Sequence, residues 1–353
     1  MEEYLITKRE GFYLENHQPL TSSEIGSLWT TYMSNSMLEC VFAYALQIVG
    51  DDEKIHTLVQ EAYDESAQNL TTIRSIFEAE SLPVPIGFST EHDVNAKAKP
   101  LFEATFFLDY LHKLGQLGSS IYSSFYAFAV RKDIRDFFAN NLTYMAQVYD
   151  KTTELMLEKG LLIRPPMISI PNHVEYADKQ TYTKGYSLFH DKRTLNVVEI
   201  SHLYANIETN ILGMMLCTGF GQTARSQKIR DYMLRGKDIA QKHTRKFTDK
   251  LLESDIQAPM TWDASPLGSS EPPFSDKLMM YHVTSLIQFS IGRYGLASGA
   301  SFRNDLPLLY GRLMTDIANY ANDGADILMK NKWLEEPPRA EDRDRVIQQK
   351  NDL

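Results

Sequence analysis

The feature that most constrains this sequence is an internal duplication. Residues at alternating spacings of three and four trace one face of a helix, and the same stripe returns 175 positions later, from Ile25 to Ile200. The first copy is Ile25, Leu28, Tyr32, Asn35, Glu39, Phe42 and Leu46, and the second is Ile200, Leu203, Ile207, Asn210, Met214 and Cys217. The chain is therefore a tandem repeat of one helical unit.

The rest of each unit pairs in the same way. The offset drifts only from 175 (Glu24 to Glu199) to 172 (Pro165 to Pro337), so the copies align with few gaps. Self-similarity over this length is the signature of a repeat architecture. The paired positions include Glu24/Glu199, Asn35/Asn210, Asp64/Asp238, Pro85/Pro259, Phe102/Phe274, Gln116/Gln288, Tyr122/Tyr294, Arg131/Arg303, Asp133/Asp305 and Pro165-Pro166/Pro337-Pro338.

Each unit is predicted to contain four helices. Capping-box spacings at Thr21/Glu24 and Asn196/Glu199 begin the two units, and residues 219–225, GFGQTAR, are interpreted as a turn between helices. We expect helices over 22–49, 53–80, 100–130 and 134–159, and again over 196–218, 226–254, 275–300 and 305–331. These ranges predict an N-terminal arm (1–19), a first bundle (20–166), a linker (167–194), a second bundle (195–338) and a charged tail (339–353).

The connection between the second and third helices of each unit decides the topology. It is about twenty residues long in both copies, which is enough to cross the length of a bundle, whereas the other joins are short. The predicted fold is therefore all-α, a tandem duplication of a ferritin-like up-down-down-up four-helix bundle. Because duplications often replace symmetric dimers, we expect the two repeats to pack as a pseudo-dimer about a pseudo-twofold axis.

Composition excludes several classes of protein. The formal net charge of −10 argues against a nucleic-acid partner, because phosphate contacts need clustered Lys and Arg. Cys40 and Cys217, one per repeat, do not suggest a disulfide framework. The first 19 residues lack a signal-peptide pattern, and no apolar run approaches the roughly 20 residues of a membrane span. We therefore expect a cytoplasmic protein.

The tandem arrangement, the Pro-Pro pair that closes each unit and the Arg-x-Asp corner before each fourth helix carry a family resemblance. With these motifs the chain resembles a family from spore-forming bacilli known as domain of unknown function 3231. That family is grouped with ferritin-like proteins and is similar to the spore-coat protein F family. The resemblance covers residues from about 20 to 338 and implies the fold, a spore setting and spore-coat protein partners or self-association. It implies no established activity.

Ferritin-like di-iron proteins use one Glu from each of two helices and Glu-x-x-His from the other two, and this full motif is absent. Glu199–His202 has the spacing, but Glu199 caps a helix. Two partial sets share a height within a bundle and could hold Fe or Mn through hard oxygen ligands and imidazole. They are Glu39, Glu65 and His112 in the first repeat, and Glu208, His243 and Asp316 in the second.

The middle of each unit also carries neutral polar residues on apolar stripes. The predicted buried polar layers are Asn35, Asn69 and Gln116 in the first repeat, and Asn210, His243 and Gln288 in the second. A buried amide without a partner costs about 1–3 kcal/mol, so such residues are expected to bond to one another and fix the helix register. The alternative is a ferritin-type centre that has lost its carboxylates.

Three functional hypotheses follow. The first is a non-catalytic structural or interaction protein, with a spore role implied by the resemblance, which the missing ligand set favours. The second is a metal-binding protein with an incomplete carboxylate and histidine site. The third is a carrier of a small apolar molecule, because the third helices are rich in Gly and Ser, which permit close packing or leave room for a ligand.

Overall fold

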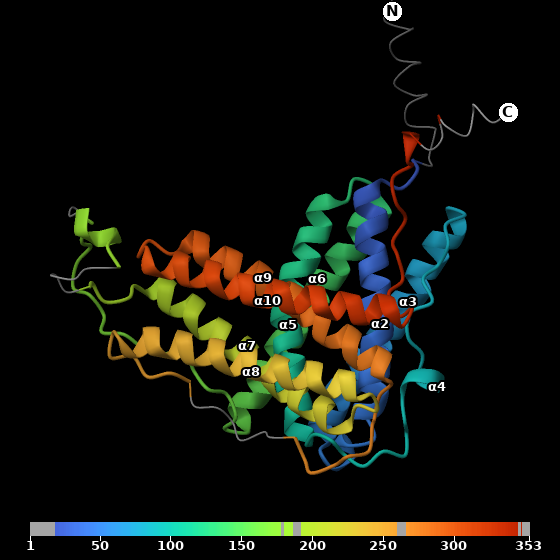
Figure 1. Ribbon diagram of the computed structural model, residues 1–353, viewed down its shortest axis with the longest axis horizontal. Coiled ribbons are helices and arrows are strands. Elements are labelled where there is room, and N and C mark those ends of the chain that lie inside the picture. The colour runs from blue at the N-terminus through green and yellow to red at the C-terminus, as the bar shows by residue number, and fades with distance from the viewer. Residues whose placement is uncertain (1–17, 178–179, 186–191, 260–265, 345–346, 348–353) are drawn as a thin grey trace, which may run out of the picture.

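The computed structural model describes residues 18–177, 180–185, 192–259, 266–344 and 347. Its regular elements are all helices, with no strand among the described residues, and one isolated bridge joins Val94 to Phe274. The first repeat consists of α2 (Ser22–Ala45), α3 (Glu53–Ala79), α5 (Ala104–Phe128) and α6 (Lys132–Glu158). The second consists of α7 (Val197–Thr223), α8 (Gln227–Leu252), α9 (Asp276–Ala300) and α10 (Asp305–Lys330). The all-α, two-repeat prediction is confirmed (Figure 1).

Three short helical turns complete the elements. A 3₁₀ turn, η1 (Val49–Asp51), links α2 to α3, a four-residue helix, α4 (Thr90–Asp93), interrupts the long connection, and η2 (Gln180–Thr183) lies in the linker. The sequence predicted none of them, because each is too short to show a periodic pattern.

The ends of the helices establish the order of directions in the first repeat. Glu24, at the start of α2, accepts the backbone N–H groups of Val130 and Arg131 between α5 and α6. Arg131 also pairs with Glu80, which follows α3. The start of α2, the ends of α3 and α5 and the start of α6 therefore share one end of the bundle, which is the predicted up-down-down-up order. The ferritin-like classification stays a prediction.

Both predicted capping boxes form, with Glu24 and Glu199 returning to the backbone N–H of Thr21 and Asn196. The predicted turn at 219–225 is wrong for residues 219–223, because α7 continues to Thr223. Gly219 is needed for packing rather than for a turn: a Cβ at this position would come within 2.7 Å of the Phe102 ring.

The two repeats pack against each other through contacts that come in reciprocal pairs. Asn95 N–H donates to the Pro273 carbonyl (2.8 Å), and Leu267 N–H donates to the Leu101 carbonyl (2.9 Å). The two donors are 172 residues apart and so are the two acceptors, so the bonds join the same pair of repeat positions in opposite directions. In the same way Tyr44 meets Phe274, with ring centroids 5.1 Å apart, and Gly219 meets Phe102. Such an exchange of equivalent positions is what a twofold relation produces.

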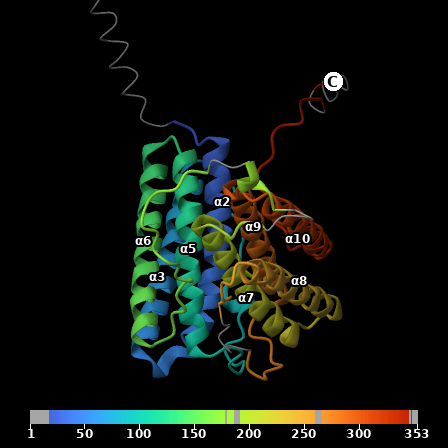
Figure 2. The ribbon, with the colours of Figure 1, turned by 90° about the vertical axis from the view of Figure 1, so that its left-hand side faces the viewer.

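One contact joins two equivalent positions directly. Tyr110 and His282, again 172 apart, lie with Oη and Nε2 3.0 Å from each other, as expected for residues close to the pseudo-axis. Buried apolar residues of both repeats form one continuous core. In Figure 2 the helices of the first repeat stand side by side and those of the second cross them at an angle. None of the described helices is long and apolar enough to cross a membrane.

Candidate functional site

The polar layer of the first repeat is built from all four helices. Asn69 on α3 lies at its centre, and its Nδ2 donates to Oδ1 of Asn35 on α2 (3.2 Å) and of Asn141 on α6 (2.7 Å). Asn141 donates back to Asn69 Oδ1 (3.1 Å), and Asn35 Nδ2 donates to Oη of Tyr122 on α5 (3.3 Å). The three amides are at most 3% exposed, so the side-chain oxygens of Asn35 and Asn141 depend on Asn69 for their hydrogen bonds.

Gln116 lies outside this layer. Its side chain is half-buried, and its Nε2 is 3.4 Å from His112 Nε2 on the next turn of α5. Sequence reasoning missed Asn141, although Asn141 completes the layer from the fourth helix. The signal available was an asparagine on the apolar stripe of α6, between Phe138 and Met145.

The polar layer of the second repeat lies at the same helix positions as that of the first but contains different side chains. His243, in the place of Asn69, is 0% exposed and brings Nδ1 to 3.1 Å from Tyr294 Oη. Asn210 Nδ2 donates to the same hydroxyl (2.7 Å). Burial lowers the pKa of His243 to about 4, against the opposing effect of Asp316, so the ring is neutral near neutral pH.

Gln288 does not join the second layer. It is exposed, so the prediction of a buried amide there is wrong. The inward stripe of α9 includes Val283, Ile287 and Tyr294, and the residue after Ile287 points about 100° away from it. Leu313 replaces the fourth-helix amide of the first repeat (313 − 141 = 172), and it is buried without polar atoms.

The first predicted metal set does not converge. Glu39 and Glu65 are half-buried, and desolvation raises the pKa of both carboxyls. His112 is buried against α6, where its Nδ1 is 3.3 Å from Thr152 Oγ1 and its ring stacks on Tyr149. Burial, followed by the charge of Lys113, lowers the pKa of His112 to about 4.

The second set is divided between two surfaces. Glu208 faces the first repeat and pairs with the buried Lys113 at 2.6 Å, while Asp316 pairs with Lys242 at 2.6 Å and keeps 3.6 Å from His243 Nε2. Among the described residues, no three His, Cys, Asp or Glu side chains are grouped to hold a metal ion. Spacing within one helix did not predict which face each residue would occupy, because Glu208 pairs with Lys113 of the neighbouring repeat.

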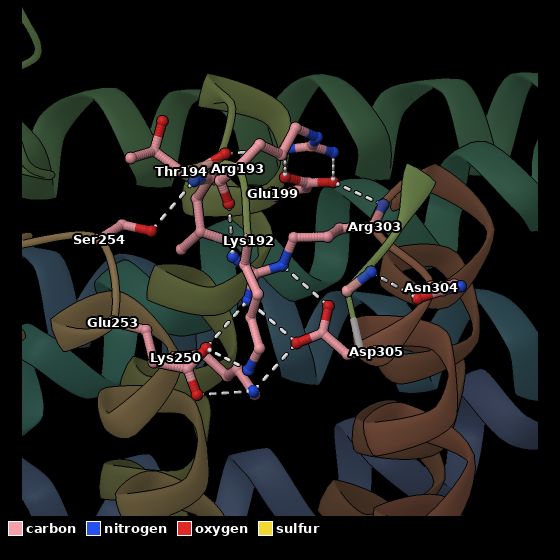
Figure 3. A network of polar contacts seen from close by, with 12 residues as sticks. Lys192, Arg193, Thr194, Glu199, Lys250, Glu253, Ser254, Arg303, Asn304 and Asp305 are labelled. Carbon is pink, nitrogen blue, oxygen red and sulfur yellow. Dashed lines mark hydrogen bonds and ion pairs between the residues drawn. The ribbon is translucent and has the colours of Figure 1, made fainter. Parts of the chain in front are cut away.

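The most extensive polar site lies at the start of the second repeat (Figure 3). Glu199 is fully buried and accepts two bonds from the Arg193 guanidinium (2.7 and 2.8 Å) and one from the Arg303 N–H (3.0 Å). Burial alone would raise the pKa of Glu199, but Arg193 and the backbone N–H groups outweigh it, and the pKa is lowered. Arg303 in turn forms a two-point pair with Asp305 (2.8 and 3.0 Å).

We call this arrangement the corner network. The first repeat has a corner network of its own, in which the Arg131 guanidinium forms two hydrogen bonds with Asp133 (2.8 and 2.7 Å). The backbone N–H of Arg131 donates to Glu24. The sequence showed both Arg-x-Asp pairs and both capping glutamates, but not that they meet. In the second repeat the network links the starts of α7 and α10 to the end of α8, so it holds three helix ends together.

One cavity, which is partly open to the surface, lies between the helices of the second repeat. It has a volume of about 50 Å³ and is bordered by residues from all four helices, α7 to α10. Small residues form much of its wall, including Gly213, Cys217, Gly236 and Ala240, and Asn210 of the polar layer also borders it.

These features define an all-α protein made of two fused, similar helical bundles, each with buried polar residues at its centre. The chain belongs to the family described as protein of unknown function (DUF3231), whose sequence profile matches residues 11–174 and again residues 183–346. No curated protein matches the chain. A similar solved structure is that of a "putative spore coat protein" from Bacillus halodurans C-125, with 20% identity and a TM-score of 0.39 over 43% of this chain and 98% of that one.

Proposed function

We propose that this protein is a non-catalytic structural or interaction protein, in which two fused bundles form one body that presents its surface to protein partners. The observation that carries the proposal is the way the buried polar groups are used. Asn35, Asn69 and Asn141 bond to one another, and Glu199 is held by Arg193 and Arg303. Groups engaged in this way support helix packing rather than reaction with a substrate.

A second observation supports the part that concerns partners. The segment after α6 exposes large apolar side chains, with Met167, Ile170, Val174 and Tyr176 between 84% and 94% exposed. We call residues 167–176 the apolar segment. Contiguous exposed apolar groups are typical of protein–protein contact sites, and the corresponding residues after the second repeat, 339–348, are mainly charged or polar. The apolar segment is therefore the proposed contact surface.

The proposed setting is the spore, on the basis of the sequence resemblance to spore-coat families. The test is a fluorescent fusion of the full chain in a sporulating Bacillus. We expect the signal to collect at the developing spore, and to stay in the mother-cell cytoplasm when Met167, Ile170 and Val174 are all changed to Ser. A matched control changes the exposed Leu252, Leu296 and Leu308 to Ser and keeps the spore signal. Uniform signal from the unchanged fusion would contradict the proposal.

The metal-binding alternative is tested on untagged protein after incubation with Fe²⁺ or Mn²⁺. A structural role predicts no stoichiometric metal after gel filtration. Retention of one or more equivalents, abolished by Glu39→Gln or by His243→Asn, would replace the structural proposal with a metalloprotein.

A further inference from the structure

The cavity of the second repeat lies where this repeat has smaller side chains than the first. Gly213 and Cys217 on α7 stand at the positions of Leu38 and Phe42 on α2, each 175 residues earlier. Leu38 and Phe42 are 7% and 1% exposed in the core of the first repeat. Replacing a leucine and a phenylalanine by smaller side chains leaves space unless the helices collapse. The cavity bordered by Gly213 and Cys217 is that space.

A polar atom beside the cavity lacks the partner that its counterpart has. In the first repeat, Asn35 Oδ1 accepts a hydrogen bond from Asn69. In the second, Asn69 is replaced by His243, whose Nδ1 contacts Tyr294 instead. Asn210 donates through Nδ2 to Asn206 and Tyr294, but its Oδ1 accepts no bond from any described residue. Asn210 is only 8% exposed and borders the cavity, so an acceptor that no described residue uses is available there.

The three hydroxyl groups of the wall already donate their hydrogens within the protein. Thr209, Ser290 and Tyr320 each donate a hydroxyl hydrogen bond to a backbone carbonyl. The remaining wall is largely aliphatic, with Ile287 and Ile317 among its members. No charged residue borders the cavity, so a charged ligand would be buried without a counter-ion. The site therefore favours a neutral molecule with one hydrogen-bond donor and an aliphatic remainder.

The volume limits the size of that molecule. At about 50 Å³, the cavity has room for roughly four water-sized groups. We propose that the core of the second repeat is a binding site for a small neutral alcohol, whose hydroxyl donates to Asn210 Oδ1 and whose alkyl chain lies against Ile287 and Ile317. This site is independent of the structural role proposed above and would stand if that role failed.

The experiment uses 1-butanol and diethyl ether, which have the same formula but differ in whether they carry a donor. Binding to the full-length chain is measured by saturation-transfer NMR at concentrations well below those that unfold helical proteins. We expect saturable binding of 1-butanol, and about fivefold weaker binding of diethyl ether, which is the effect of one hydrogen bond. Equal binding of both would overturn the role of Asn210, and no saturable binding of 1-butanol would overturn the site.

Variants place the signal inside the second repeat. Gly213→Leu restores the side chain of the first repeat and is expected to abolish binding. Gly213→Ala is the milder change, because a Cβ at this position meets no atom within 4 Å, and it should weaken binding at least severalfold while the helix content stays unchanged. Gly292→Ala, also in an α-helix with open space around its Cβ, is the matched control and should bind like the unchanged chain. Binding that survives both Gly213 changes would contradict the proposed location.

Discussion

The two repeats agree at their ends and differ in their centres. Both corners join a buried capping glutamate to an Arg-x-Asp pair, through Glu24 and Arg131 in one and Glu199 and Arg303 in the other. The centre of the first repeat has amides from three helices and a tyrosine from the fourth. The centre of the second repeat has one histidine, one tyrosine and one asparagine. The ends set where each helix starts, so the comparison indicates that the fold depends on the corners and permits change between them.

The corners themselves are not equally buried. The side chain of Arg131 is 15% exposed and that of Arg303 only 1%. The difference comes from the linker, because the Arg193 side chain covers the second corner and bonds Glu199. The residue at the same position of the first repeat is Gln18 (193 − 18 = 175), and its backbone carbonyl accepts a hydrogen bond from Arg131. The second corner should therefore be the more sensitive to loss of its arginine.

The largest effect is expected for Arg303→Ala. The change leaves Asp305, which is 1% exposed, without its two-point partner, and breaking a buried pair costs about 3–5 kcal/mol. The more exposed Arg131→Ala should cost less, about 1–2 kcal/mol, because water can replace part of the lost interaction. Urea unfolding followed by circular dichroism measures both. Equal losses would show that burial of the corner does not matter.

Asn69→Ala should have the next largest effect. It removes the centre of the first layer and leaves two buried acceptors, Asn35 Oδ1 and Asn141 Oδ1, without the donor that they share, which costs about 2–4 kcal/mol for two unpaired buried groups. The comparison is sharpened by Leu313→Asn, which gives the second repeat the amide that the first has on its fourth helix. Because it places an amide where the second core has an apolar side chain, this asparagine should destabilise the chain by about 1–3 kcal/mol. If it stabilised the protein, the two centres would be interchangeable.

Acidification should act mainly through the buried histidines. Burial lowers the pKa values of His112, His243 and His282 to about 4 from an ordinary 6.5. Between these values the unfolded chain binds protons that the folded chain does not, so stability falls as the pH decreases from 6.5 towards 4, by up to about 3 kcal/mol per histidine. Glu199 and Asp305, whose pKa values are lowered, lose their contribution only at lower pH.

The measurement is the urea midpoint at several pH values in this range. His243→Asn gives the second layer the residue of the first and removes one titrating ring, so the decline in stability on acidification should become shallower. Gln288→Asn, an exposed change in the same repeat, is the control and should leave the decline unchanged. An unaltered decline in His243→Asn would contradict the assignment of a buried neutral histidine.

The smallest effect is expected on the surface of the first bundle. Lys151 and Glu61 form an ion pair of 2.7 Å with side chains 49% and 39% exposed. Exposed pairs contribute about 0–1 kcal/mol, so Lys151→Ala should barely move the urea midpoint. A loss as large as that of Arg131→Ala would mean that surface pairs between α3 and α6 hold the bundle together.

The sequence predicted what depends on a single helix and its repeat. The periodic stripes located the long helices, the caps at Thr21 and Asn196 located their starts, and the length of one connection gave the order of directions. It could not predict which element covers each helix face. Glu208 turned out to face the other repeat, Gln288 faces solvent, and Asn141 joins a layer with partners on α2 and α3. These outcomes depend on packing between elements that spacing within one helix does not encode.

The central claim is that the two repeats form one packed body with a shared core. The most direct test is hydrogen exchange read by mass spectrometry at increasing urea, because it follows peptides from each repeat separately. With a shared core, α2 and α5 should lose protection at the same urea concentration as α7 and α9. The interface change Gly219→Leu, which intrudes on Phe102, should lower this concentration for both repeats. Separate transitions, with only the second repeat affected by Gly219→Leu, would contradict the shared core.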